Sequence, residues 1–144
     1  MSTQTGEQLG ALLAETSRVW RHRLDVRLRP LGLSQTRWIL ILQLSKAEGG
    51  LAQSELATRL GISQASLSAQ IERMVRDGWV ERHASAGDRR CKTINLTEQA
   101  RSLSRSIRQT AATLRDELLE GLAEDDIAAC EQVLKHILQR AQSL

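Results

Sequence analysis

Apolar residues recur at steps of three and four positions through the first 31 residues, which places them on one face of a long helix. Pro30 marks the end of this helix, because the residue before a proline avoids helical backbone angles. Ser34 can cap a second helix, and the Glu48-Gly49-Gly50 step predicts the loop that follows it. The first stripe consists of Leu9, Leu12, Leu13, Thr16, Trp20, Leu24, Leu28 and Leu31.

A helix-turn-helix is predicted between residues 53 and 71. Ala57 is small enough for a close helix crossing, and Gly61 can adopt the left-handed conformation that a tight turn requires. Ser63 then caps the second helix, in which Leu67 is the expected buried anchor. The same pattern also fits an ordinary helical hairpin with a glycine cap. The residues expected to face inward are Leu56, Ala57, Leu60, Leu67, Ile71, Met74 and Val75.

After Gly78 the apolar period changes from that of a helix to that of a strand, so a β-hairpin is predicted. Residues 79–83 and 91–96 are its expected strands, and residues 84–90 form the turn, where Gly87-Asp88 supplies the turn chemistry. A hairpin directly after a helix-turn-helix is the order of a winged helix. This combination is more specific than either part alone.

Two further helices are predicted after the hairpin. Thr97 caps a long helix that runs to about Glu120, and Gly121 separates it from a last helix that begins at Glu124. The expected fold class is therefore mainly α with a small β-hairpin wing.

The composition agrees with a mainly α fold and argues against a membrane-spanning or a disulfide-rich protein. The 144 residues include three tryptophans but no phenylalanine or tyrosine, so the core must be largely aliphatic, which favours helices. No apolar run approaches the ~20 residues needed to span a bilayer. Cys91 and Cys130 are too few for a disulfide framework and lack metal-ligand spacing, which favours the reducing cytoplasm.

Enzymatic chemistry is not expected. The three histidines, His22, His83 and His136, are scattered over two predicted helices and a strand. The sequence contains no glycine-rich phosphate loop, nucleophile elbow or paired metal ligands. We therefore expect no catalytic residue, no metal site and no cofactor.

The net charge of +3 conceals an uneven distribution. Residues 18–37 carry six arginines and one aspartate, residues 53–105 carry nine basic and six acidic groups, and residues 106–144 have a net charge of −3. The positive charge of the first two-thirds favours contact with a polyanion there, although a basic excess is also typical of a solvated surface.

The second helix of the helix-turn-helix presents hydroxyls, amides and small side chains, and its first charged residue is Glu72. Hydroxyl and amide groups can bond base edges and phosphates, and alanines permit close approach and contact with a thymine methyl. A polar, capped surface helix is the alternative. The candidate DNA-binding residues of this recognition helix are Ser63, Gln64, Ala65, Ser66, Ser68, Ala69, Gln70 and Arg73.

The turn of the predicted hairpin is basic. Its cations can enter the minor groove, where A·T-rich sequence concentrates negative potential, and Asp88 can pair with an arginine and fix its direction. The alternative is a solvated tip whose ion pairs contribute less than about 1 kcal/mol. The candidate wing residues are Asp88, Arg89, Arg90 and Lys92.

Together these motifs resemble the MarR family of bacterial transcriptional regulators, and within it the SlyA-like branch. The resemblance covers about residues 7–142 and implies a homodimer in which each subunit presents a winged helix to half of a pseudo-palindromic operator. We expect a repressor. Related proteins often carry an arginine at Ala69, so Ser66, Ser68 and Gln70, or else the wing, carry more of the base readout. The resemblance rests on residues 31–38 (LGLSQTRW), 53–57 (QSELA), 61–67 (GISQASL), 77–80 (DGWV), 88–90 (DRR) and 96–98 (LTE).

A dimer is expected on physical grounds as well, because the first and the last two helices carry apolar stripes too long for one small winged helix to cover. The expected organisation is an N-terminal dimerisation helix at 1–33, a winged helix-turn-helix DNA-binding domain at 34–97, and C-terminal dimerisation helices at 98–144.

The resemblance also implies a response to small aromatic acids or to oxidants. An aromatic carboxylate needs an apolar slot and a cation, although the tryptophans concerned are equally suited to the core. Cys91 lies among three cations that favour its thiolate, so a redox-responsive regulator is an alternative. A further alternative function is that of a winged helix that binds protein instead of DNA, but such a protein would not need the basic wing. The candidate ligand-binding residues are Arg18, Trp20, Arg21, His22 and Trp38.

Overall fold

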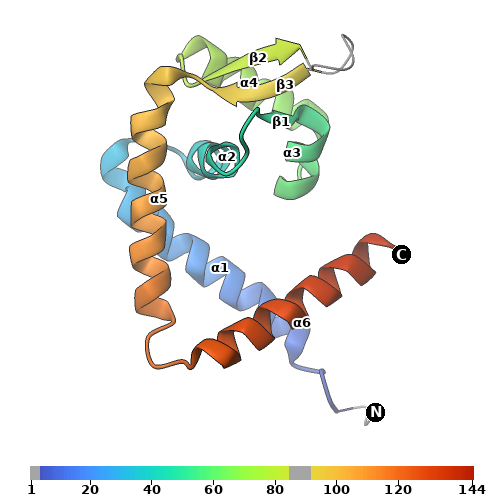
Figure 1. Cartoon of the computed structure of the whole chain (residues 1–144). Helices are drawn as coiled ribbons and strands as arrows, with labels where there is room; N and C mark the ends of the chain where they lie inside the picture. The colour runs from blue at the N-terminus through green and yellow to red at the C-terminus, as the bar shows by residue number, and fades with distance from the viewer. Residues whose placement is uncertain (1–3, 85–91) are drawn as a thin grey trace. The chain divides into compact units, whose positions relative to one another are not determined.

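A computed structural model describes residues 4–84 and 92–144 of the chain, which forms two compact units, residues 1–112 and 113–144. The described elements confirm a mainly α fold with a small sheet (Figure 1). The first unit contains α1 (Leu9–Leu28), the 3₁₀ turn η1 (Arg29–Leu31), α2 (Gln35–Ser45), β1 (Leu51–Ala52), α3 (Gln53–Leu60), α4 (Gln64–Arg76), β2 (Val80–Ala84), β3 (Lys92–Leu96) and most of α5 (Glu98–Leu118). The second contains the last turns of α5 and the whole of α6 (Glu124–Gln142).

Three predicted helix caps are confirmed. The Ser34 hydroxyl accepts from the backbone N–H of Arg37 at 3.3 Å, and the Ser63 hydroxyl accepts from that of Ser66 at 3.1 Å. Thr97 caps α5 through the N–H of Ala100 at 3.2 Å. Each bond satisfies one of the N–H groups that a helix start leaves without an intrahelical acceptor.

The helix-turn-helix has the predicted tight turn. Gly61 adopts a left-handed conformation with φ 65°, and the N–H of Ile62 closes α3 by donating to the carbonyl of Ala57 at 3.2 Å. Ala57 and Leu67 are buried where the two helices pack. The prediction for Val75 was wrong, because 39% of its surface is exposed.

The sheet has three strands where the sequence predicted two. It is antiparallel with the order β1-β3-β2, and Leu51 of β1 lies opposite Ile94 of β3. β1 was missed because it is two residues long, too short for an alternating pattern. β2 pairs with β3 from Val80 opposite Leu96 to Ala84 opposite Lys92.

The core of the first unit, among the described residues, is largely aliphatic and includes Trp38. The indole Nε1–H of Trp38 donates to the Asp25 carboxylate at 2.9 Å, which joins α2 to α1. In the second unit, α6 begins at Glu124 as predicted, and Cys130 on this helix is exposed. The buried residues of the first unit include Leu24, Leu28, Leu40, Ile41, Leu44, Leu56, Ile71, Met74, Val80, Ile94, Ala100 and Ile107.

Two adjacent glycines before β1 give a stability prediction. Both have a left-handed backbone, with φ 80° at Gly49 and 83° at Gly50. A Cβ at Gly50 would lie 2.6 Å from the backbone carbonyl oxygen of Ile94, whereas a Cβ at Gly49 would meet nothing within 4 Å. We expect Gly49→Ala to cost about 1 kcal/mol through backbone strain alone, and Gly50→Ala to cost about 2 kcal/mol more through the clash. Urea denaturation of both variants measures the difference, and equal losses would show that the loop does not pack on β3.

Candidate nucleic-acid interface

The recognition helix predicted from sequence corresponds to α4 and divides cleanly into two sides. Leu67, Ile71 and Met74 are fully buried, and they occupy one face of the helix at the spacing i, i+4 and i+7. The opposite face is exposed along its length, and its N-terminal half carries no charge. A helix of this kind can approach a duplex closely, because short side chains leave room for the groove edges. The exposed residues include Gln64, Ala65, Ser66, Ala69, Glu72, Arg73 and Arg76.

The N-terminal turn of α4 combines a side-chain cap with free backbone donors. The Ser63 hydroxyl, besides accepting from the Ser66 N–H, donates to the Ser66 hydroxyl at 3.1 Å. The N–H groups of Gln64 and Ala65 have no acceptor within the helix, as at any helix start. These two donors and the positive end of the helix dipole suit a phosphate oxygen.

Ser68 and Gln70, unlike the other candidates beyond the cap, are only partly exposed. The side-chain amide of Gln53, the first residue of α3, donates to the Ser68 hydroxyl at 2.6 Å. This bond fixes the Ser68 oxygen and leaves its O–H free to donate. Gln53 is not among the residues predicted from the sequence, because only the fold brings it beside a residue 15 positions away.

The C-terminal end of α4 is tied to the start of α2. The Arg37 guanidinium pairs with the Asp77 carboxylate at 2.9 Å, and both side chains are partly exposed. An exposed pair of this kind contributes less than about 1 kcal/mol to stability. Its geometric effect is to join the C-cap of α4 to the helix that also carries Trp38.

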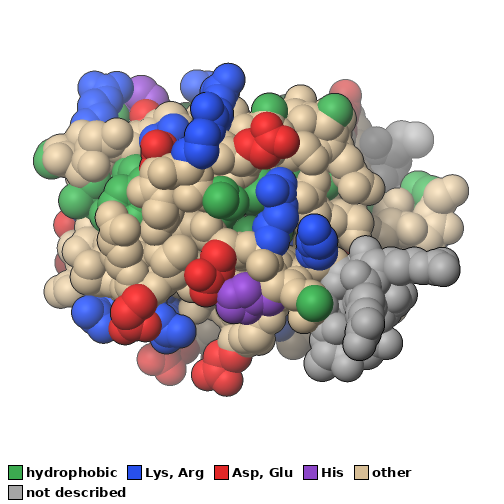
Figure 2. Space-filling model, turned by 90° about the horizontal axis from the view of Figure 1, so that it is seen from above, with side chains coloured by type: hydrophobic (Ala, Val, Ile, Leu, Met, Phe, Trp, Pro, Cys, Tyr) green, Lys and Arg blue, Asp and Glu red, His purple; other side chains and the backbone are tan. Residues whose placement is uncertain are grey.

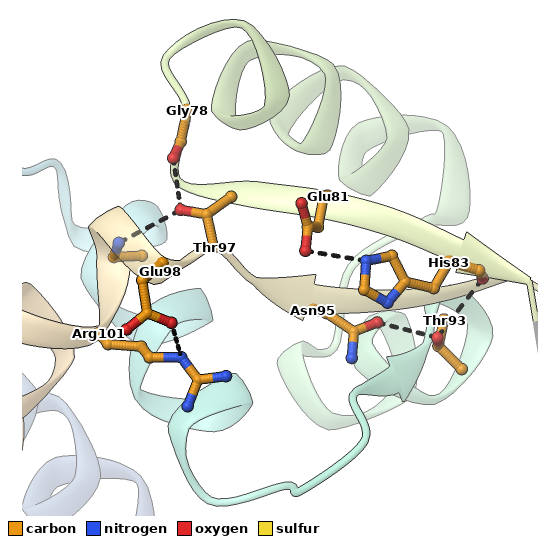
Figure 3. A network of polar contacts seen from close by, with 9 residues as sticks. Gly78, Glu81, His83, Thr93, Asn95, Thr97, Glu98 and Arg101 are labelled. Atoms are coloured by element: carbon orange, nitrogen blue, oxygen red, sulfur yellow. Dashed lines mark hydrogen bonds and ion pairs between the residues drawn. The ribbon is translucent and has the colours of Figure 1, made fainter.

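The base of the hairpin is fastened to α5 and to the end of α4 (Figure 3). The Thr97 hydroxyl donates to the carbonyl of Gly78 at 2.6 Å while it caps α5. On β2, the imidazole of His83 lies 2.9 Å from the Glu81 carboxylate. The Thr97 bond holds the end of β3 beside the turn that follows α4, whereas the His83 contact lies within β2.

The predicted wing falls largely outside the described residues. Asp88, Arg89, Arg90 and Cys91 all lie outside them, so their wing and redox roles remain predictions. Lys92 is described and is exposed at the first position of β3. Arg82, exposed on β2, is a further cation of the hairpin that was not predicted from the sequence.

Figure 2 shows the molecule from above, the side on which α4 and the sheet lie in Figure 1. Basic and acidic side chains are interspersed among uncharged ones on this face, and its described residues form no single basic patch. Affinity for a polyanion would therefore depend on close fit and on the hairpin tip as well as on charge.

The predicted ligand-binding residues are only partly brought together. Trp20, Arg21 and Trp38 line one cleft of about 330 Å³ between α1 and α2, together with Leu24 and Leu42. Arg18 and His22 are exposed on α1 and do not line it. The cleft thus has the apolar wall and the single cation that an aromatic carboxylate needs, but Trp38 also serves as a core residue.

Residues 4–84 and 92–144 contain no cluster of three His, Cys, Asp or Glu side chains suited to hold a metal ion. None of the helices described is long and apolar enough to cross a membrane.

The capped recognition helix, its tight turn and the three-stranded sheet with a hairpin define a winged helix-turn-helix protein. A sequence model of the MarR family matches residues 31–90. The chain is also similar to the crystal structure of transcriptional regulator PA3341, at 41% identity over 94% of this chain and 99% of that one, with a TM-score of 0.88. The chain belongs to the MarR family.

Two further solved structures support this assignment. AbsC, a MarR family transcriptional regulator from Streptomyces coelicolor, is 27% identical over 100% of this chain and 99% of its own, with a TM-score of 0.81. A cysteine-to-serine mutant of MarR from E. coli, solved in complex with operator DNA, is 26% identical over 95% of this chain and 99% of its own, with a TM-score of 0.73.

Proposed function

We propose that this protein is a sequence-specific DNA-binding transcriptional regulator of the SlyA-like branch, and that it acts as a repressor in the bacterial cytoplasm. The observation that carries the proposal is the exposed, uncharged and closely approachable face of α4 around Ala65, Ser66 and Ala69. The relative solved with operator DNA supports it. In this proposal α4 enters the major groove, and Arg89, Arg90 and Lys92 of the wing reach the minor groove.

The proposed assembly is a homodimer on a pseudo-palindromic operator. Apolar side chains are exposed on α1 in the first unit and, separately, on α6 in the second unit, a helix that has no buried residue. Solvent-exposed apolar stripes of this length favour burial against another chain. The exposed apolar residues are Leu9, Leu12, Val19 and Val26 on α1, and Val133, Leu134 and Leu138 on α6.

The proposal is tested by selecting bound fragments from a random pool of duplex DNA with the purified protein. We expect a symmetric motif of two half-sites whose centres lie about one DNA turn apart. Binding of the selected site should weaken steeply as the salt concentration rises, because several phosphates are neutralised. Recovery of no motif above the input pool would contradict sequence-specific binding.

We further propose that a small aromatic acid binds the cleft between α1 and α2 and releases the DNA. With salicylate as the probe, millimolar concentrations should lower operator affinity about fivefold or more, because a ligand shifts the equilibrium toward the state that it binds better. Arg21→Gln should remove the response, whereas Arg18→Gln, which deletes a neighbouring arginine outside the cleft, should retain it. Titration of salicylate into a DNA-binding assay measures both, and equal responses of the two variants would exclude this cleft.

A further inference from the structure

A second cleft in the first unit has no residue of α4 and no tryptophan in its lining, although the last residues of α2 contribute to it. It has a volume of about 410 Å³, within the range of small-molecule sites, and it is formed by α5, the end of β3 and the loop between α2 and β1. Three arginines of α5, Arg101, Arg105 and Arg108, line one side. Asn95 and the loop around Glu48 line the rest.

The three arginines form a stripe along α5. Their spacing of i, i+4 and i+7 places them on one face of the helix, over a length of about 10 Å. Arg101 pairs with Glu98 at 3.0 Å, whereas no carboxylate within the described residues pairs with Arg105 or Arg108. Like charges at these spacings repel one another, and an anion between them would relieve that repulsion.

The rest of the cleft adds hydrogen-bond donors. The Oδ1 atom of Asn95 accepts from the Thr93 hydroxyl at 2.9 Å, which orients the amide and leaves its NH₂ group to donate (Figure 3). Guanidinium groups have donors and no acceptor. Glu48 is the one acidic residue among the described residues that line the cleft, so its lining has a net positive charge.

We propose that this cleft binds a small, multiply charged oxyanion, such as a phosphate ester or a di- or tricarboxylate. Guanidinium groups bind phosphate and carboxylate oxygens through paired, charge-assisted hydrogen bonds, and two unpaired arginines 3 positions apart can share one such ligand. The cleft is large enough for a body attached to the anionic group. Its lining has no aromatic side chain, which separates it from the cleft between α1 and α2.

The test uses the full chain without DNA, so its outcome does not depend on the proposed regulatory function. Inorganic pyrophosphate and citrate are titrated by calorimetry at constant ionic strength, with chloride as the balancing anion. We expect saturable binding, which Arg105→Gln/Arg108→Gln weakens tenfold or more. The control Lys46→Gln/Arg76→Gln removes two exposed cations outside the cleft and should bind as the parent does.

Asn95→Asp is a second variant, which tests the site if the double arginine variant does not fold. It keeps the size of the side chain and the acceptor for Thr93 but replaces an NH₂ donor with a negative charge, so anion binding should again fall tenfold or more. Heats no larger than those of the chloride control would overturn the proposal. So would a double arginine variant that binds the anions as the parent does.

Discussion

Replacement of Ala69 by glutamate should lower the affinity for a selected operator several hundredfold. Ala69 is exposed on the side of α4 opposite the buried Leu67 and Ile71, so a longer side chain there does not disturb the core. In the complex it would place a carboxylate against the acceptor-rich groove and the phosphates. A like charge brought into such an interface costs several kcal/mol, and about 3–4 kcal/mol corresponds to this loss.

Fluorescence anisotropy with a labelled operator measures this effect, and thermal denaturation confirms that the variant is folded. Ser102→Glu is the matched control, because it adds the same charge at an exposed helical position on α5 and should change operator affinity less than about threefold. Operator binding by Ala69→Glu at the parent affinity would show that this face of α4 does not enter the groove.

The elements that the sequence predicted well are those fixed by local chemistry. Ser34, Ser63 and Thr97 cap helices because a hydroxyl two or three residues before a free N–H can reach it whatever the rest of the chain does. Gly61 makes the turn because few other residues tolerate its backbone conformation. The buried face of α4 followed from its period, with Leu67 and Ile71 inside.

The features that the sequence did not predict depend on partners distant along the chain. β1 exists because Leu51 meets Ile94 on β3, and two residues cannot show a strand pattern by themselves. The bond between Gln53 and Ser68 likewise requires α3 and α4 to be packed first. Val75 has the spacing of an inward residue but lies at the edge of the buried face, where the neighbouring elements do not cover it.

The candidate ligand sites likewise combine features that follow from local sequence with features that depend on the fold. Trp20 and Trp38 were selected because both are aromatic and lie near arginines, and the fold does place them in one cleft. Which arginine joins them could not be predicted, because Arg18 and Arg21 differ by a rotation about α1 that only the packing decides. The arginine stripe on α5 is visible in the sequence, but the loop that faces it is not.

A half-turn insertion between the two half-sites of the operator should lower affinity about a thousandfold. In the proposed homodimer the two recognition helices are held at a fixed separation of about 34–36 Å, one turn of the duplex. Five added base pairs rotate one half-site to the opposite side of the DNA, so only one α4 helix can bind specifically. The expected loss is the specific binding free energy of one half-site. A thousandfold change in affinity lies within the range that separates specific from non-specific binding.

Two control operators test whether the loss of affinity depends on the spacing of the half-sites. Five base pairs added outside the motif should leave affinity unchanged, because both half-sites keep their register. Ten base pairs added between the half-sites return both half-sites to the same side of the DNA but increase their separation by about 34 Å. A rigid dimer should therefore still bind this operator weakly, whereas a flexibly joined pair of subunits would regain affinity. Gel-shift titration of the parent site and the three altered sites measures all four affinities. Binding that is unaffected by the half-turn insertion would contradict the dimer, because it would show that each chain reads its half-site alone.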